Sequence, residues 1–142
     1  MRKYFHHYKN LSMATIEKFE EILSWQEARK LNQKIGRMID SGRFEKNFRL
    51  IAQVDGSAGS IMDNIAEGFE RSGNREFIQF LYIAKGSCGE FRSQLYKALD
   101  RNYITQEEFD DFAKKTKKVS SLIQKLINYL HETDMRGTKY KT

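Results

Sequence analysis

Apolar residues recur along the chain at alternating steps of four and three, the spacing of the buried seam of a packed helix. The clearest seam consists of Phe77, Leu81, Ala84, Cys88, Phe91, Leu95 and Ala98. A second seam precedes it and consists of Ile51, Val54, Ala58, Ile61, Ile65 and Phe69. We therefore predict two helices joined by Ser72-Gly73-Asn74, where Gly73 takes a positive φ and Asn74 caps the following helix.

Similar patterns predict one helix before this hairpin and one after it. The first is expected from about Ile16 to Asp40. Its inner face is predicted to carry Ile22, Trp25, Ala28, Leu31, Ile35, Met38 and Ile39. The seam of the last helix consists of Phe112, Thr116, Val119, Ile123, Leu126 and Leu130. This helix is predicted to begin at Thr105, capped together with Glu108, with Ile104 and Phe109 as a hydrophobic staple.

The two inner helices are expected from about residue 44 to 71 and from about residue 75 to 101. The chain has no proline, which suits long uninterrupted helices. The predicted fold is an all-α, antiparallel up-and-down four-helix bundle formed by residues 16–133. Residues 1–15 are interpreted as an N-terminal arm and residues 134–142 as a basic C-terminal tail.

The predicted third helix is apolar on more than one face. Apolar side chains that flank its seam are Ile78, Phe80, Tyr82, Ile83, Tyr96 and Leu99. A monomeric bundle needs only one apolar stripe on each helix, so the additional surface predicts contact with a neighbouring subunit. Gly86 and Gly89 on the same helix would let another backbone come close. We therefore expect a homo-oligomer.

Several short motifs in the two inner helices are specific as a set. They are the run Asn64-Ile65-Ala66-Glu67-Gly68, then Arg71, Phe77, Phe80-Leu81, Ile83-Ala84, Gly86-Ser87 and Glu90. With them the chain closely resembles the 23S rRNA intervening-sequence protein family. The opening Phe19-Glu20-Glu21-Ile22-Leu23-Ser24-Trp25-Gln26 and the later Tyr103-Ile104 and Glu107-Glu108-Phe109 extend the resemblance over most of the chain.

The resemblance implies a four-helix bundle that assembles as a homopentamer. It also implies binding to RNA or DNA, or to a nucleic-acid enzyme, because relatives include the accessory protein of diversity-generating retroelements. The sequence departs from the family in the second helix. Ser60-Ile61-Met62-Asp63-Asn64 lacks the usual proline, and Asp55-Gly56 stands where a basic pair is common.

The net charge of +6 indicates an anionic partner, but much of it lies at the chain ends. Residues 1–16 contribute +3 and residues 134–142 contribute +2, which leaves +1 for residues 17–133. Within the bundle, basic residues gather on the first helix and on the last. The candidates for nucleic-acid binding are Arg29, Lys30, Lys34, Arg37, Lys114, Lys115, Lys117 and Lys118. Each cluster is also compatible with an ordinary solvated helix face.

A polar stripe on the second helix forms the other candidate site. It consists of Ser60, Asn64, Glu67 and Arg71, which share one helical face. It has two interpretations, a functional site or a buried hydrogen-bond network that fixes helix or subunit register, with Glu67 and Arg71 as an i,i+4 pair.

The sequence carries no pattern typical of an enzyme. His6-His7 and the distant His131 do not have the spacing of a zinc site, and no phosphate-binding glycine loop or nucleophile motif occurs. Cys88 lies in a seam and is interpreted as a small buried apolar residue. We expect no metal, no cofactor and no catalysis. Neither a membrane span nor a signal peptide is indicated, so we expect a cytoplasmic protein.

Two functions remain open on the sequence. In the first, the protein is a non-catalytic oligomeric adaptor that binds RNA or DNA through basic side chains, with strongly salt-dependent affinity. In the second, it is a structural homo-oligomer that scaffolds a protein partner without binding nucleic acid. The second predicts an apolar surface that stays exposed after assembly.

Overall fold

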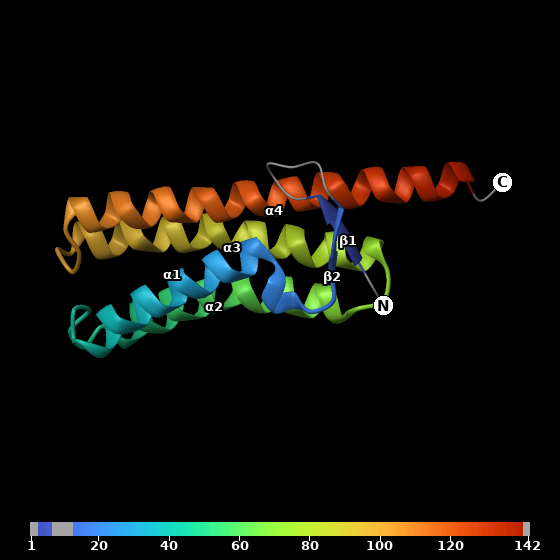
Figure 1. The fold of residues 1–142 in the computed structure, drawn as a ribbon. Helices are drawn as coiled ribbons and strands as arrows, with labels where there is room; N and C mark the ends of the chain where they lie inside the picture. Colours follow the sequence, from blue (N-terminus) through green and yellow to red (C-terminus); the bar gives the residue numbers. More distant parts are fainter. Residues whose placement is uncertain (1–2, 7–12, 141–142) are drawn as a thin grey trace.

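The computed structural model describes residues 3–6 and 13–140, and the side chains of residues 16–133. Four long helices dominate it (Figure 1). They are α1 (Leu23–Asp40), α2 (Phe48–Glu70), α3 (Asn74–Asp100) and α4 (Gln106–Tyr140). A 3₁₀ turn, η1 (Phe19–Glu21), and two short strands, β1 (Lys3–His6) and β2 (Met13–Ile16), precede them. The four predicted helices are confirmed.

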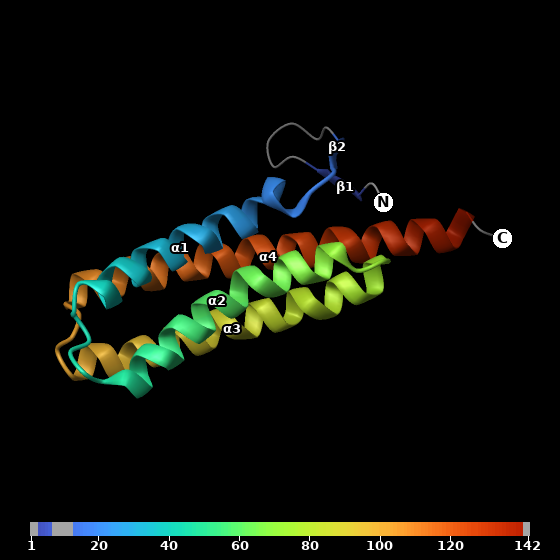
Figure 2. The same cartoon turned by 90° about the horizontal axis from the view of Figure 1, so that it is seen from below.

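The helices run alternately up and down, so that each one is antiparallel to its neighbours (Figures 1 and 2). α2 packs against α1 and α3, and α4 packs against α3 and α1. The loop between α1 and α2 and the loop between α3 and α4 therefore lie at the same end of the bundle (Figure 1). The short turn between α2 and α3 lies at the other end, as do β1 and β2.

The predicted seams form the core. All residues of the α3 seam are buried, and so are Val54, Ala58, Ile61, Ile65 and Phe69 of the α2 seam and every predicted inward residue of α4. Ile51 and Trp25 are only partly buried at its edge. The Thr116 hydroxyl is buried without cost, because it donates a hydrogen bond to the Phe112 carbonyl oxygen at 2.7 Å.

α2 and α3 approach each other closely where α2 carries Gly68. A Cβ added to Gly68 would lie 2.6 Å from Phe80 Cβ and 3.0 Å from Phe77 Cδ1. No rotamer change can relieve the first of these contacts, because Cβ is fixed by the backbone. The glycine in the Asn64-Ile65-Ala66-Glu67-Gly68 run is therefore required by packing.

The turn between α2 and α3 matches the prediction in one residue and differs in the other. Gly73 has a φ of +103°, as expected for a glycine in a tight turn. Asn74, however, is the first residue of α3, and the cap position is Gly73, which has no side chain to accept a hydrogen bond. The predicted Asn74 cap is wrong because the positive φ falls at the cap residue itself.

The start of α4 follows the prediction closely. Thr105 Oγ1 accepts a hydrogen bond from the Glu108 amide at 3.1 Å, and Glu108 Oε1 accepts one from the Thr105 amide at 2.8 Å. Ile104 and Phe109 are both buried beside this capping box. The reciprocal hydrogen bonds and the staple together fix where the helix begins.

Two predicted helix starts are wrong. α1 begins at Leu23 instead of Ile16, because Lys18 and Ile22 have extended backbone conformations on either side of η1. α2 begins at Phe48 instead of Phe44. Asn47 caps it by accepting a hydrogen bond from the Leu50 amide at 3.1 Å. Phe44 is fully buried, but it reaches the core from the loop.

The chain ends contain regular structure that the apolar pattern did not predict. β1 and β2 form an antiparallel pair with Lys3 opposite Ile16 and His6 opposite Met13. β1 contacts α4, which extends to Tyr140 and so includes most of residues 134–142 in its backbone. The side chains of the basic tail, and those of His6 and His7, lie outside the described residues.

Candidate functional site

The lysine run on α4 points in two directions. Successive helical residues are rotated by about 100°, so Lys115 and Lys118 share one side of the helix and Lys114 and Lys117 another. Lys115 and Lys118 reach side chains on the α1 side of α4. Lys114 and Lys117 line a groove between α4 and α3. The eight basic candidates therefore do not form one uniform patch.

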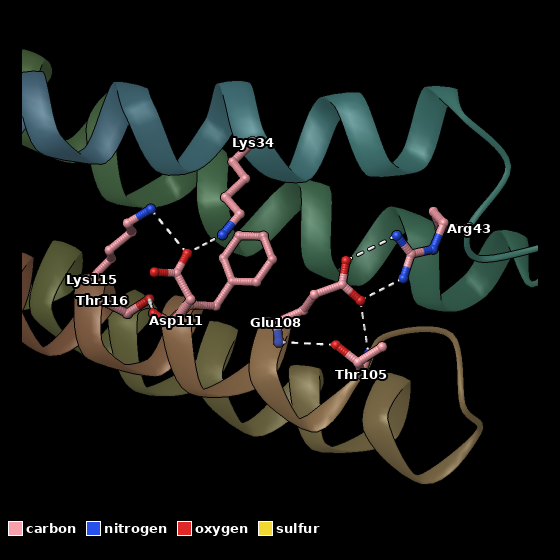
Figure 3. A network of polar contacts seen from close by, with 8 residues as sticks. Lys34, Arg43, Thr105, Glu108, Asp111, Lys115 and Thr116 are labelled. Atoms are coloured by element: carbon pink, nitrogen blue, oxygen red, sulfur yellow. Dashed lines mark hydrogen bonds and ion pairs between the residues drawn. The ribbon is translucent and has the colours of Figure 1, made fainter.

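On the α1 side of α4, two carboxylates form ion pairs with lysines from α1 and from α4. Asp111 Oδ2 pairs with Lys34 from α1 and with Lys115 Nζ, which lies 2.9 Å away on α4. Figure 3 shows the Asp111 carboxylate between these two ammonium groups. Lys34 Nζ also lies 4.5 Å from the centre of the Phe112 ring, within the range of a cation–π contact.

Glu27 has the same role further along the bundle. Its Oε1 lies 3.3 Å from Lys30 Nζ on the same helix and 3.7 Å from Lys118 Nζ on α4. The basic clusters of α1 and α4 thus converge within a single chain. We name this surface, with Glu27, Lys30, Lys34, Asp111, Lys115 and Lys118, the α1/α4 ion-pair strip.

The strip is largely neutralised from within. Hydrogen bonds from Lys34 and Lys115 hold the pKa of Asp111 below its usual range. The carboxylate is therefore ionised at neutral pH, and it offsets some of the charge of both lysines. Long, exposed lysine stems such as those of Lys30 and Lys118 remain hydrated, and pairs of this kind contribute little to stability.

Arg29 and Arg37, the other α1 candidates, are exposed. The Arg29 guanidinium lies 5.9 Å from the centre of the Trp25 ring, at the limit of a cation–π contact. In the part of the chain whose side chains are described, neither arginine pairs with a carboxylate.

A second network joins the two loops at one end of the bundle (Figure 3). Arg43, after α1, donates from Nη1 and Nη2 to the two carboxylate oxygens of Glu108 at 2.9 and 2.5 Å. These bonds, with weaker support from Thr105, lower the pKa of Glu108 to about 2. The pKa of Arg43 is raised by the same pair. The capping glutamate therefore also ties α4 to the α1–α2 loop.

The groove between α3 and α4 has a different character. Its volume is about 620 Å³, and it is lined by Gly89, Arg92, Ser93, Tyr96, Phe109, Asp110, Ala113, Lys114 and Lys117. Across the described side chains, none of its three cations forms an ion pair. Asp110 accepts a hydrogen bond from Gln106 Nε2 at 2.9 Å. The lining therefore carries a net charge of +2, from three cations and one carboxylate.

Two aromatic rings, those of Tyr96 and Phe109, line this groove. Tyr96 is 55% exposed, and its ring centre lies 4.5 Å from that of Phe109, at an interplanar angle of 51°. Phe109 is itself buried. Tyr96 is thus supported from the core side and presents much of its surface to solvent.

The predicted polar stripe on α2 separates into two pairs. Asn64 Nδ2 donates to the Ser60 carbonyl oxygen at 2.8 Å and to Ser60 Oγ at 2.9 Å, and Ser87 on α3 donates to the same hydroxyl at 2.9 Å. Glu67 and Arg71 form an i,i+4 pair at 3.2 Å, but both are about half exposed. A buried network that includes all four residues is therefore wrong. The Ser60–Asn64 half links α2 to α3.

The described side chains contain no group of three or more His, Cys, Asp or Glu residues able to hold a metal ion. Burial raises the pKa of the Cys88 thiol to about 12, so it stays protonated at neutral pH. No helix within the described stretches is both long and apolar enough to cross a membrane.

Sequence reasoning missed the residues that decide how available each cation is. Glu27 and Asp111 sit on the inner edges of α1 and α4, where their partners come from another helix. Arg92 and Tyr96 were not grouped with the α4 lysines, because a groove between two helices has no signature in either helix alone. A three- and four-residue spacing of Gly89, Arg92 and Tyr96 on α3 was the available signal.

Comparison with solved structures supports the fold. The chain is similar to the crystal structure of a protein of unknown function from the S23 ribosomal protein family of Bacteroides thetaiotaomicron. The two share 23% sequence identity with a TM-score of 0.69, over 74% of this chain and 98% of that one. No curated protein matches the sequence.

The sequence profile described as 23S rRNA-intervening sequence protein matches residues 20–125. This range includes η1 from its second residue, all of α1, α2 and α3, and the first half of α4. The capping box at Thr105 and the packing of Gly68 against Phe80 both lie within it. The chain therefore belongs to the 23S rRNA-intervening sequence protein family.

Proposed function

We propose that this protein is a non-catalytic homo-oligomeric adaptor that binds RNA or DNA through basic side chains. The observation that carries the proposal is that four cations of the basic clusters, Arg29, Arg37, Lys114 and Lys117, are exposed and lack a carboxylate partner among the described side chains. Next to them, Lys30 and Lys34 of α1 and Lys115 and Lys118 of α4 share two carboxylates within one chain. The family's name, which refers to an rRNA intervening sequence, is in line with a nucleic-acid partner.

Binding of this kind acts through the phosphate backbone. Each phosphate that a lysine or arginine neutralises releases counterions, so the affinity falls steeply as salt rises. Arg29, Arg37, Lys114 and Lys117 are exposed and lack a carboxylate partner among the described side chains, so they are the strongest contributors. Lys30, Lys34, Lys115 and Lys118 contribute less, because they must first exchange an internal partner for phosphate.

The oligomer in this proposal is built on the outer face of α3. Tyr82 and Ile83 are 50% and 52% exposed, and Gly86 one turn later has open space where a side chain would be. Adjacent exposed apolar residues of this size favour burial against a neighbouring subunit. Ile78, in contrast, is buried within the chain, and Tyr96 lines the groove between α3 and α4, so the proposed interface is narrower than the sequence indicated. The resemblance favours a pentamer.

The rival function is a structural homo-oligomer that scaffolds a protein partner. It is favoured by Phe48, which is 71% exposed at the start of α2 and lies on a different helix from Tyr82 and Ile83. An exposed apolar residue outside the proposed subunit interface remains accessible to another protein after the oligomer assembles. A nucleic-acid enzyme is one class of partner that both functions accommodate.

Light-scattering mass, with and without a mixed RNA at low and moderate salt, tests the proposal. We expect a multimer near five subunits that gains mass with RNA at low salt and loses it as salt rises. A multimer whose mass is indifferent to RNA at every salt concentration would favour the scaffold. A monomer would overturn the proposed assembly and leave Tyr82 and Ile83 unexplained.

A further inference from the structure

We infer that the groove between α3 and α4 is a binding site for single-stranded nucleic acid, in which Arg92, Lys114 and Lys117 hold phosphates and Tyr96 stacks on a base. This inference rests on the proposed nucleic-acid function and adds the site and the strandedness. The residues come from two helices whose packing in the core fixes their spacing.

The cations of this groove are available to bind phosphate, because in the described part of the chain they lack the carboxylate partners that the lysines of the α1/α4 ion-pair strip have. Lys115 and Lys118 lie on the same helix as Lys114 and Lys117, with the same chemistry and similar exposure. Lys115 and Lys118 each face a carboxylate, whereas Lys114, Lys117 and Arg92 line the groove without a carboxylate partner among the described side chains. Three cations gathered in a concave site attract an anion with several charges.

The shape of the groove fits an extended strand. Gly89, Arg92 and Tyr96 mark a stretch of α3 about 10 Å long at about 1.5 Å per residue. Gly89 and Ser93 have small side chains, and a Cβ on Gly89 would meet nothing within 4 Å. The α3 wall is therefore low at Gly89 and Ser93, on either side of Arg92, which leaves room for a sugar or a base beside the helix.

Tyr96 favours an unpaired strand over a duplex. A nucleobase can stack on an exposed aromatic ring only when its own face is free, which in a duplex holds only at the ends. Phe109 supports the Tyr96 ring from the core side, so little side-chain freedom is lost when a base packs on it. Bases of every kind have a π face, so this contact is not selective for sequence.

The test measures the binding of a fluorescent dT oligonucleotide of about 12 residues, near the site sizes of single-strand binders, by anisotropy at about 0.1 M salt. Lys114→Ala/Lys117→Ala is expected to weaken binding by about 30-fold and to lower the salt slope by about 1.4, since two phosphate contacts are lost. The matched control is Lys115→Ala/Lys118→Ala, which removes the same charge from the same helix. We expect it to weaken binding less than about 3-fold.

Substitutions of Tyr96 test the stacking contact independently of the phosphate contacts. Tyr96→Leu is expected to weaken binding of the single strand by about 10-fold without a change in salt slope, because stacking releases no counterions. Tyr96→Phe keeps the ring on Phe109 and is expected to bind like the wild type. Circular dichroism and light-scattering mass confirm for each variant that the fold and the assembly are unchanged.

The outcomes separate this inference from the proposed function. If the wild type binds neither the dT oligonucleotide nor the mixed RNA at low salt, the nucleic-acid function itself fails, whereas binding to the mixed RNA alone overturns only this inference. If it binds but the two double variants lose equal affinity, binding follows overall charge and the groove is not the site. Equal affinity for a duplex of the same length, or no effect of Tyr96→Leu, overturns the stacking. A change of mass in Lys114→Ala/Lys117→Ala alone identifies the groove as a contact between copies, which also overturns the inference.

Discussion

Both sides of α4 carry lysines, but the lysines of the two sides have different surroundings. On the α1 side, Glu27 and Asp111 each bind two lysines, one from each helix. On the α3 side, Lys114 and Lys117 share a groove with Arg92 and the exposed ring of Tyr96. The first arrangement joins two helices of the bundle. The second leaves its cations without a carboxylate partner among the described side chains.

A run of lysines in the sequence therefore does not measure the charge that is available for binding. Lys114, Lys115, Lys117 and Lys118 are near neighbours in sequence, yet Lys114 and Lys117 line the groove beside α3, whereas Lys115 and Lys118 pair with carboxylates on the α1 side. Whether each lysine is available depends on a carboxylate from another element.

The α1 side should matter for stability and the α3 side should not. Glu108→Ala removes a capping hydrogen bond and the bidentate partner of Arg43, and we expect a loss of about 2 kcal/mol in the free energy of unfolding. Lys117→Ala, the control on the α3 side, should change it by less than about 0.5 kcal/mol. Urea denaturation at one fixed protein concentration measures both. Equal losses would contradict the stabilising role assigned to the Arg43–Glu108 pair.

Acid should weaken the same contact. The pKa of Glu108 is lowered to about 2, mainly by the hydrogen bonds from Arg43. A carboxylate with a lowered pKa adds stability that is fully present above its unfolded pKa of about 4.5 and is lost as pH falls toward about 2. Glu108→Gln cannot titrate, so the stability gap between it and the wild type should shrink by about 1 kcal/mol between about pH 7 and about pH 3.

The measurement is a series of urea denaturation curves for both proteins across this pH range. Asp111 also has a lowered pKa, but it is present in both proteins and cancels from the difference. A gap that stays constant down to about pH 3 would mean that Glu108 is not ionically paired with Arg43 in solution.

Much of the fold was predictable because core seams are local patterns. The α3 seam from Phe77 to Ala98 and the capping box at Thr105 both depend on residues within one helix or one turn. The sequence was less informative where the backbone leaves a helix. Ile22 and Phe44 have the right apolar character for helical cores, but they are buried from extended and loop segments that no periodicity marks.

The candidate sites were only partly predictable. The eight basic residues were identified by type and exposure, and seven of them are exposed or paired at the surface, with Lys34 half-buried beside Phe112. The sequence could not show which of these cations pair with a carboxylate, because the partners of Lys34 and Lys118 lie far away along the chain, on the opposite helix. The Ser60–Asn64 pair likewise acquires its third member, Ser87, only when α2 and α3 pack.

Releasing the α1-side cations should create a binding surface. In Asp111→Asn, Lys34 and Lys115 lose their shared carboxylate and can exchange it for phosphate. Removing one negative charge should raise the affinity for a mixed RNA by about 3- to 5-fold at about 0.1 M salt and steepen the salt slope by about 0.7. Filter binding across a salt series measures both. Glu107→Gln is the control for charge alone, because Glu107 is an exposed residue of α4 that lies neither in the groove lining nor in the described ion pairs. A similar gain in both variants would favour a general field effect over release of the paired lysines.

Glu27→Gln should give the same effect on a smaller scale. Its two lysines are farther away, at 3.3 and 3.7 Å, and they are 69% and 60% exposed, so they are already largely hydrated. We expect about a 2-fold gain in RNA affinity and a change in stability below about 0.5 kcal/mol. Measured in the same salt series, the gain should rank below that of Asp111→Asn. The reverse order would mean that the closeness of an internal carboxylate does not set how available a lysine is, and the contrast between the two sides of α4 would lose its physical basis.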